Sequence, residues 1–91
     1  MVLGREILMA LFMDVHERVE GLTAEAVAGA HKRDLDVQAA HGVNYLQYWF
    51  DEGSGKVFCL VEAPSAEAAA AVHREAHGLL ADSITPVKKG Q

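Results

Sequence analysis

Residues 43–65, VNYLQYWFDEGSGKVFCLVEAPS, decide the fold of this chain. Two runs rich in β-branched and aromatic residues, 43–50 and 57–63, flank the turn sequence at 51–55. This pattern predicts two strands joined by a short turn. Pro64 ends the second strand, and Ser65 is a typical N-cap, so a helix is expected to follow directly.

The flanking sequence supplies one further helix and two further strands. Thr23 is a typical N-cap, and Gly42 suits the end of a helix that begins there. The pattern predicts the remaining elements as a strand at 11–16, a helix at 23–41, a helix from 65 to about 77 that ends at Gly78, and a strand at 82–87. The order βαββαβ predicts an α+β fold, the ferredoxin-like plait, with an antiparallel sheet and both helices on one face.

Length and composition agree with a single small domain. We expect an N-terminal extension at 1–8, one ferredoxin-like domain at 9–88 and a tail at 89–91. The net charge of −5 has no basic stripe, which argues against a nucleic-acid partner. Cys59 is the single cysteine, which excludes an internal disulfide framework and favours a cytoplasmic location. The apolar run at 7–13 is short and interrupted by charge, so we expect neither a signal peptide nor a membrane span.

The hairpin also predicts which side chains share a face of the sheet. With Phe50 opposite Val57, a mainly aliphatic face is expected under the helices: Leu11, Met13, Val15, Leu46, Tyr48, Phe50, Val57, Cys59 and Val61. The opposite, open face would carry Phe12, Asp14, His16, Tyr45, Gln47, Trp49, Phe58, Leu60 and Glu62. Because this second set is too apolar to remain in water, we expect a homodimer that packs through it.

The predicted helix at 23–41 has polar residues in the middle of its inward face. Its apolar arc is centred near Val27, yet His31, Asp34 and Gln38 lie within that arc. A buried carboxylate without a partner is costly, so this polar row needs a metal ion, a bound ligand or a closed hydrogen-bond network. The sequence leaves these three explanations open.

Further candidate ligands lie on other elements. His73 and His77 are four residues apart on the second predicted helix, where both rings lie on one flank, accessible to a metal from solvent. Asp14 and His16 alternate on the first strand, where a polar rim on the open face is the simpler interpretation. His41 is expected to complement a helix dipole, and Cys59 to act as a small buried hydrophobe.

Several strings of the chain resemble one known family. These are LFMDVH at 11–16, His31 with Asp34, FCL at 58–60, EAP at 62–64 and VHREAHG at 72–78. Together they resemble a family of small ferredoxin-like proteins, long catalogued as a domain of unknown function, that includes a nickel-binding member. The resemblance covers roughly 9–88 and implies a homodimer that binds nickel near its surface, for sequestration or tolerance. It adds His16, His31, His73 and His77 as candidate ligands.

Two functions follow as hypotheses. The first is a protein that binds nickel(II) or another divalent transition metal through His16, His31, Asp34, His73 and His77. The second is a small dimeric α+β-barrel enzyme, a cofactor-free oxygenase or isomerase, with a pocket at His31, Asp34 and Gln38. Of the two, the metal-binding protein is favoured over an enzyme.

Overall fold

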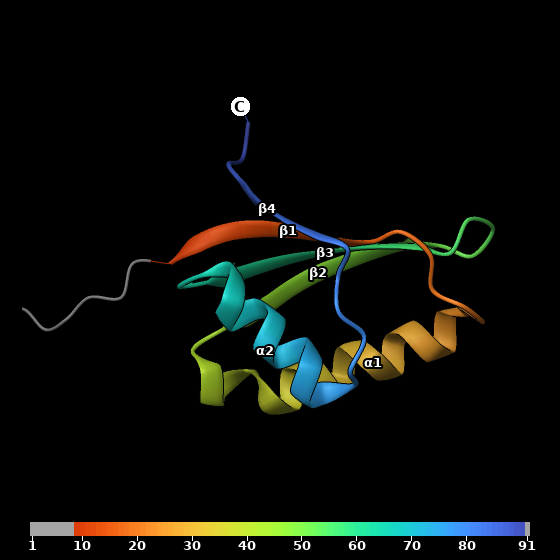
Figure 1. The fold of residues 1–91 in the computed structure, drawn as a ribbon, viewed down its shortest axis with the longest axis horizontal. Coiled ribbons are helices and arrows are strands. Elements are labelled where there is room, and N and C mark those ends of the chain that lie inside the picture. Colours follow the sequence, from red (N-terminus) through yellow and green to blue (C-terminus); the bar gives the residue numbers. More distant parts are fainter. Residues whose placement is uncertain (1–8, 91) are drawn as a thin grey trace, which may run out of the picture.

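The computed structural model describes residues 9–90, so the predicted N-terminal extension at 1–8 lies outside the described residues, as does Gln91. The described residues form four strands, two α-helices and a short 3₁₀ segment (Figure 1). In chain order these are β1 (Ala10–His16), α1 (Ala24–Val37), η1 (Gln38–His41), β2 (Asn44–Asp51), β3 (Lys56–Ala63), α2 (Ala66–Ala76) and β4 (Ser83–Val87). The predicted βαββαβ order is therefore confirmed.

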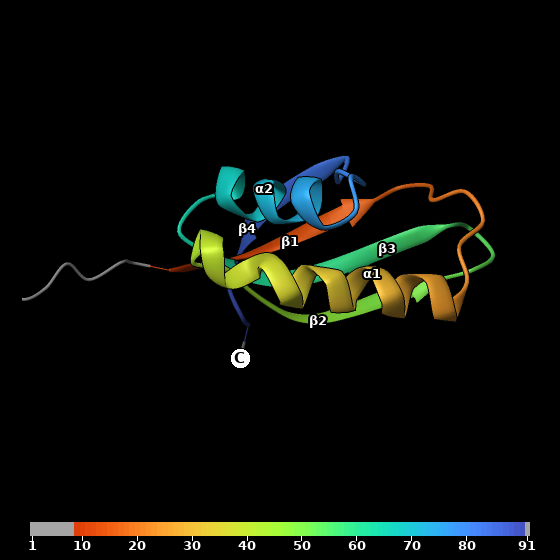
Figure 2. The ribbon, with the colours of Figure 1, turned by 90° about the horizontal axis from the view of Figure 1, so that it is seen from below.

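The sheet has the strand order β2-β3-β1-β4, and every neighbouring pair is antiparallel. Both helices lie on one face of this sheet (Figure 1). In Figure 2, α1 runs along the β2 side of the sheet and α2 along the β4 side. The predicted ferredoxin-like plait is confirmed, and residues 9–90 form no covering layer on the opposite face of the sheet.

The helix ends follow their sequence signals. Thr23 Oγ1 accepts a hydrogen bond from the backbone N–H of Ala26, and Ser65 Oγ accepts one from Ala68, so both predicted N-caps are confirmed. Gly42 has φ +66° and ends the first helical segment, as predicted. The predicted helix over 23–41 differs from the structure at its last turn, because residues 38–41 tighten into the 3₁₀ segment η1.

The predicted faces of β1 were wrong. Phe12, Asp14 and His16 pair with residues of β3 whose side chains lie under the helices, and all three are buried. The prediction placed the aliphatic residues of β1 there because an isolated carboxylate is costly to bury. In the folded chain this cost is offset by His16 of the same strand, by His73 of α2 and by Tyr45 of β2.

The register of the hairpin was predicted correctly at its turn and incorrectly beyond it. Phe50 pairs with Val57, and Tyr48 pairs with Cys59, as expected. A β-bulge between Tyr45 and Gln47 then adds one residue to β2. Leu46 is consequently 44% exposed, whereas Tyr45 is buried in the core.

These corrections redefine the uncovered face of the sheet. Alternation along the strands and the pairing register place seven apolar residues on it, and we call this surface the open face: Leu11, Met13, Val15, Trp49, Phe58, Leu60 and Val87. Trp49 is 47% exposed in the single chain. The open face is therefore more apolar than the sequence predicted, because Asp14 and His16 do not belong to it.

Candidate metal centre

Side chains with metal-binding atoms converge between the sheet and α2. Asp14 and His16 belong to β1, Cys59 lies opposite Asp14 on β3, and His73 belongs to α2. The four residues each offer one ligand atom, and these atoms all lie within 4.8 Å of one another. All four residues are buried, with Asp14 0% and His73 1% exposed. We call this set the inner group.

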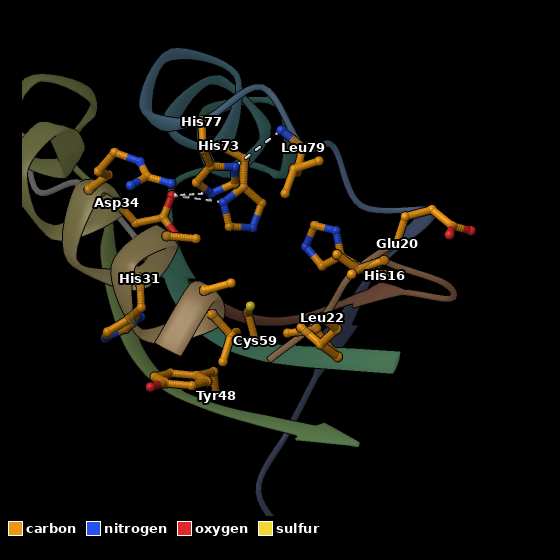
Figure 3. Close-up of a pocket in the computed structure, with 17 residues that line it drawn as sticks. His16, Glu20, Leu22, His31, Asp34, Tyr48, Cys59, His73, His77 and Leu79 are labelled. Atoms are coloured by element: carbon orange, nitrogen blue, oxygen red, sulfur yellow. Dashed lines mark hydrogen bonds and ion pairs between the residues drawn. The ribbon is translucent and has the colours of Figure 1, made fainter. Parts of the chain in front are cut away.

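His73 lies at the centre of the polar contacts. Its Nε2 is 3.0 Å from Asp14 Oδ2, and its Nδ1 is 2.9 Å from Asp34 Oδ1. His77 Nε2 approaches the same Asp34 oxygen at 3.1 Å (Figure 3). Asp34, His73 and His77 therefore form a second set of possible ligands, the outer group, which shares His73 with the inner group.

Tyr45 fixes the position of this cluster from β2. Its hydroxyl lies 3.1 Å from both Asp14 Oδ2 and the carbonyl oxygen of Ala69, either of which can accept its single proton. Its ring stacks on His73, with 4.7 Å between centroids and 27° between planes. The bulge in β2 is what turns Tyr45 toward the helices, so this irregularity of the strand contributes directly to the site.

The buried charges stabilise one another. Burial alone would raise the pKa of Asp14, but the close contacts of its carboxylate with the His16 and His73 imidazoles lower it well below its usual range. Burial likewise opposes ionisation of Asp34, while His73 and His77 lower its pKa. Burial would lower the pKa of His73, yet its two carboxylate partners raise it to about 9. Burial, reinforced by Asp14, raises the pKa of the Cys59 thiol.

Two atoms of the inner group lack a hydrogen-bond partner. Asp14 Oδ1 and His73 Nε2 are both buried and have no hydrogen-bond partner among the described residues. Each has only an ion-pair contact without hydrogen-bonding geometry, Oδ1 with His16 Nε2 at 3.5 Å and His73 Nε2 with Asp14 Oδ2 at 3.0 Å. An unpaired buried polar atom costs about 1–3 kcal/mol, so such atoms are uncommon without a role. A cation between them would use both atoms.

The donor set fits a divalent transition metal. Carboxylate oxygen, imidazole nitrogen and thiolate sulfur together suit borderline ions such as nickel, zinc, cobalt and copper. The Nδ1 of His73 meets the Asp34 carboxylate, which is the usual outer partner of a metal-binding histidine. A metal would also stabilise the Cys59 thiolate against the effect of burial.

The structure brings together four of the five predicted ligands. His16, Asp34, His73 and His77 meet, but His31 lies apart from the inner and outer groups and packs its ring against Tyr48 at 4.7 Å. The prediction that His73 is accessible to solvent was wrong, because α1 packs beside α2 and encloses that flank.

The three residues of the polar row, His31 and Asp34 on α1 and Gln38 at the start of η1, have three separate roles. Asp34 joins His73, and His31 contacts Tyr48. The Gln38 side chain accepts a hydrogen bond from the backbone of Tyr45 at 2.8 Å, and Gln38 is absent from the cavity that the other two residues line. The row therefore does not assemble the three-residue pocket of the enzyme hypothesis.

Sequence reasoning undervalued two residues. Asp14 was interpreted as part of an exposed rim, and Cys59 as a simple hydrophobe. Asp14 and Cys59 are neighbours because they pair across adjacent strands. This pairing could have been predicted only from the register of β1 against β3, which the sequence of β1 does not show. His41, expected to act on a helix dipole, forms an ion pair with Glu75 at 2.8 Å.

Comparison with known proteins agrees with this donor chemistry. Residues 12–87 match the family model described as nickel responsive protein SCO4226-like. The chain belongs to this family. It is also similar to a solved structure, the crystal structure of SCO4226 from Streptomyces coelicolor A3(2), with 43% identity and a TM-score of 0.84. That match covers 90% of this chain and 100% of the other.

The family resemblance expected from the sequence strings is thus confirmed. None of the curated proteins compared with the chain matches it. Within residues 9–90, none of the helices has the length and apolar character needed to cross a membrane.

Proposed function

We propose that this SCO4226-like protein binds one divalent transition metal ion, with nickel favoured, at the inner group, and that it serves in sequestration or tolerance of that metal in the cytoplasm. One observation carries the proposal. Asp14 Oδ1 and His73 Nε2 are unpaired and buried among four ligand atoms that lie within 4.8 Å of one another. The cation would be cargo, so no catalytic step is assigned to these residues.

Nickel is favoured over other ions by the description of the family, which is nickel responsive. Intrinsic affinity alone would favour copper, since divalent ions follow a fixed order at most nitrogen and sulfur sites. The donor set is therefore evidence for a transition metal, and the family is the support for nickel.

The inner group is preferred over the outer group because of its unpaired atoms. In the outer group Asp34 Oδ1 already accepts a hydrogen bond from His73 Nδ1 and forms an ion pair with His77 Nε2. With a metal on Nε2 of His73, the Nδ1–H still donates to Asp34, and that interaction orients the ring.

A matched pair of histidine variants tests the location. The rings of His16 and His77 both lie close to the His73 ring, with centroid distances of 5.1 and 4.8 Å, but His16 belongs to the inner group and His77 to the outer group. Isothermal titration of nickel into chelator-treated protein should give strong binding for the wild type and His77→Ala, and lost binding for His16→Ala. Replacement of His41, which is outside both groups, should have no effect.

If His77→Ala loses nickel binding and His16→Ala retains it, the ion is bound by the outer group instead. An absence of binding heat with nickel, zinc and copper in the wild type would refute the proposed function altogether.

A homodimer through the open face completes the proposal. A contiguous set of apolar side chains on an uncovered sheet face is typical of a surface that packs against a partner. Such a dimer leaves the inner group within each subunit, since that group lies on the helix side of the sheet.

A further inference from the structure

A cavity of about 190 Å³ lies between α1 and the sheet, beside the inner group. Its wall is mainly aliphatic and comes from α1, β3 and the loops that follow β1 and α2: Val19, Leu22, Ala26, Val27, Ala30, Val57 and Leu79. Figure 3 shows Leu22, Tyr48, His31 and Leu79 around its border. The lining includes exposed Glu20 and Leu79, so the cavity communicates with the surface.

The cavity is too large for a metal ion alone. A cavity of about 150 Å³ with aliphatic walls accommodates a benzene molecule, whereas one water needs only about 30 Å³. A space of this size beside buried histidines therefore fits a molecule of about one aromatic ring.

The polar groups of the lining indicate what such a molecule carries. His31 and Tyr48 present two packed rings with 41° between their planes. The described residues supply no hydrogen-bond partner to the His31 ring, while burial keeps its pKa below the usual value and so favours the neutral ring. His73 also lines the cavity, but its Nε2 lies 3.0 Å from Asp14 Oδ2 and belongs to the inner group.

Charge in the lining is largely compensated. Asp34 is paired with His73 and His77, and the exposed Arg33 and Glu20 have opposite signs. A neutral ligand is therefore favoured over an ion.

We propose that this cavity binds a neutral molecule of one aromatic ring bearing a hydroxyl group, a phenol, with the ring between the aliphatic wall and Tyr48 and the hydroxyl hydrogen-bonded to the His31 ring. The proposal accounts for the inward position of His31, which the metal site leaves unexplained. It does not require a bound metal, and no reaction of the phenol is implied.

The test uses phenol and the metal-free protein. Chemical shifts of backbone amides should titrate saturably with phenol, and the largest changes should occur in α1 and β2. A ligand with so few atoms is expected to bind with a Kd of about 1 mM or somewhat tighter. Toluene, which lacks the hydroxyl, should bind more weakly, because it cannot form the hydrogen bond to the His31 ring.

Two variants of α1 provide the matched comparison. Ala30 lines the cavity, whereas Ala28 is exposed on the same helix and does not. Ala30→Leu should fill the space and abolish the titration, while Ala28→Leu should bind phenol like the wild type. If Ala30→Leu folds poorly by circular dichroism, Ala26→Leu narrows the cavity from a more exposed position.

Nickel binding separates this inference from the proposed function. Ala30→Leu should retain the nickel affinity of the wild type, since Ala30 offers no ligand. Unsaturable shifts, phenol binding that survives Ala30→Leu, or tighter binding of benzoate or toluene than of phenol would each overturn the proposal.

Discussion

Asp14→Asn is the substitution that separates the electrostatic role of this carboxylate from its role as a ligand. The side chain is fully buried and close to three partners, with His73 Nε2 at 3.0 Å, the Tyr45 hydroxyl at 3.1 Å and His16 Nε2 at 3.5 Å. Asparagine has nearly the same shape and keeps an oxygen acceptor, so the change removes charge with little change in packing.

The magnitude follows from the contacts that remain. A hydrogen bond to a charged group contributes about 1.5–3 kcal/mol, and His73 keeps its second carboxylate, Asp34, at 2.9 Å. We therefore expect the free energy of unfolding of the metal-free protein to fall by about 2–3 kcal/mol. For a domain of this size that corresponds to a decrease of roughly 10–20 °C in Tm.

Thermal and urea denaturation followed by circular dichroism measure this change. Excess nickel should raise the Tm of the wild type and leave that of Asp14→Asn unchanged, since one ligand of the inner group is lost. Asp34→Asn should retain binding with an affinity lowered by about 10–100-fold, as expected for an outer partner.

His41→Ala serves as the control, because it removes only a partly exposed ion pair, worth at most about 1 kcal/mol. An Asp14→Asn protein that loses less than about 0.5 kcal/mol and still binds nickel like the wild type would refute the reasoning.

Three other predictions concern protons and assembly. The pKa of His73 rises from 6.5 to about 9 on folding, so its contribution to stability should be complete below pH 6.5 and disappear as the pH rises through about 9. The pKa values of Asp14 and Asp34 fall below 3.8, so their contributions should be complete above that pH and disappear on acidification; unfolding midpoints at a series of pH values would reveal both limits. Nickel binding near pH 7.5 should release the proton of His73, and identical titration heats in buffers of different ionisation enthalpy would contradict this. Trp49→Asp should convert a dimer to a monomer by light scattering with an unchanged circular dichroism spectrum, whereas an unchanged mass would exclude the open face as the interface.

The fold could be predicted because its signals are local. Thr23 and Ser65 cap helices through their own side chains, and Gly42 ends a helix through its positive φ. Each signal operates within a few residues, so the element order is evident from the sequence without knowledge of the tertiary structure. The same applies to the hairpin near Phe50 and Val57, where the turn fixes the register.

The site was only partly predictable because it depends on distant partners. Whether Asp14 faces the core is decided by His73 and Tyr45, which are far away in the chain. The bulge after Tyr45 has no clear signal in the sequence, yet it reverses the orientation of the strand residues before it. His31 fits the predicted inward face of the helix, but spacing alone does not distinguish a ligand from a ring in a cavity wall.

The dispersed origin of the inner group has a consequence for the lifetime of the protein in the cell. Its members come from β1, β3 and α2, and these elements separate when the chain unfolds. A metal bound there would therefore stabilise the folded state. A ligand that binds only the folded state adds about 2.7 kcal/mol of stability at a concentration 100 times its Kd. Because proteases degrade the unfolded fraction, the loaded protein would persist while the metal-free protein is removed more rapidly. The amount of this protein would then follow the supply of metal without any change in its synthesis.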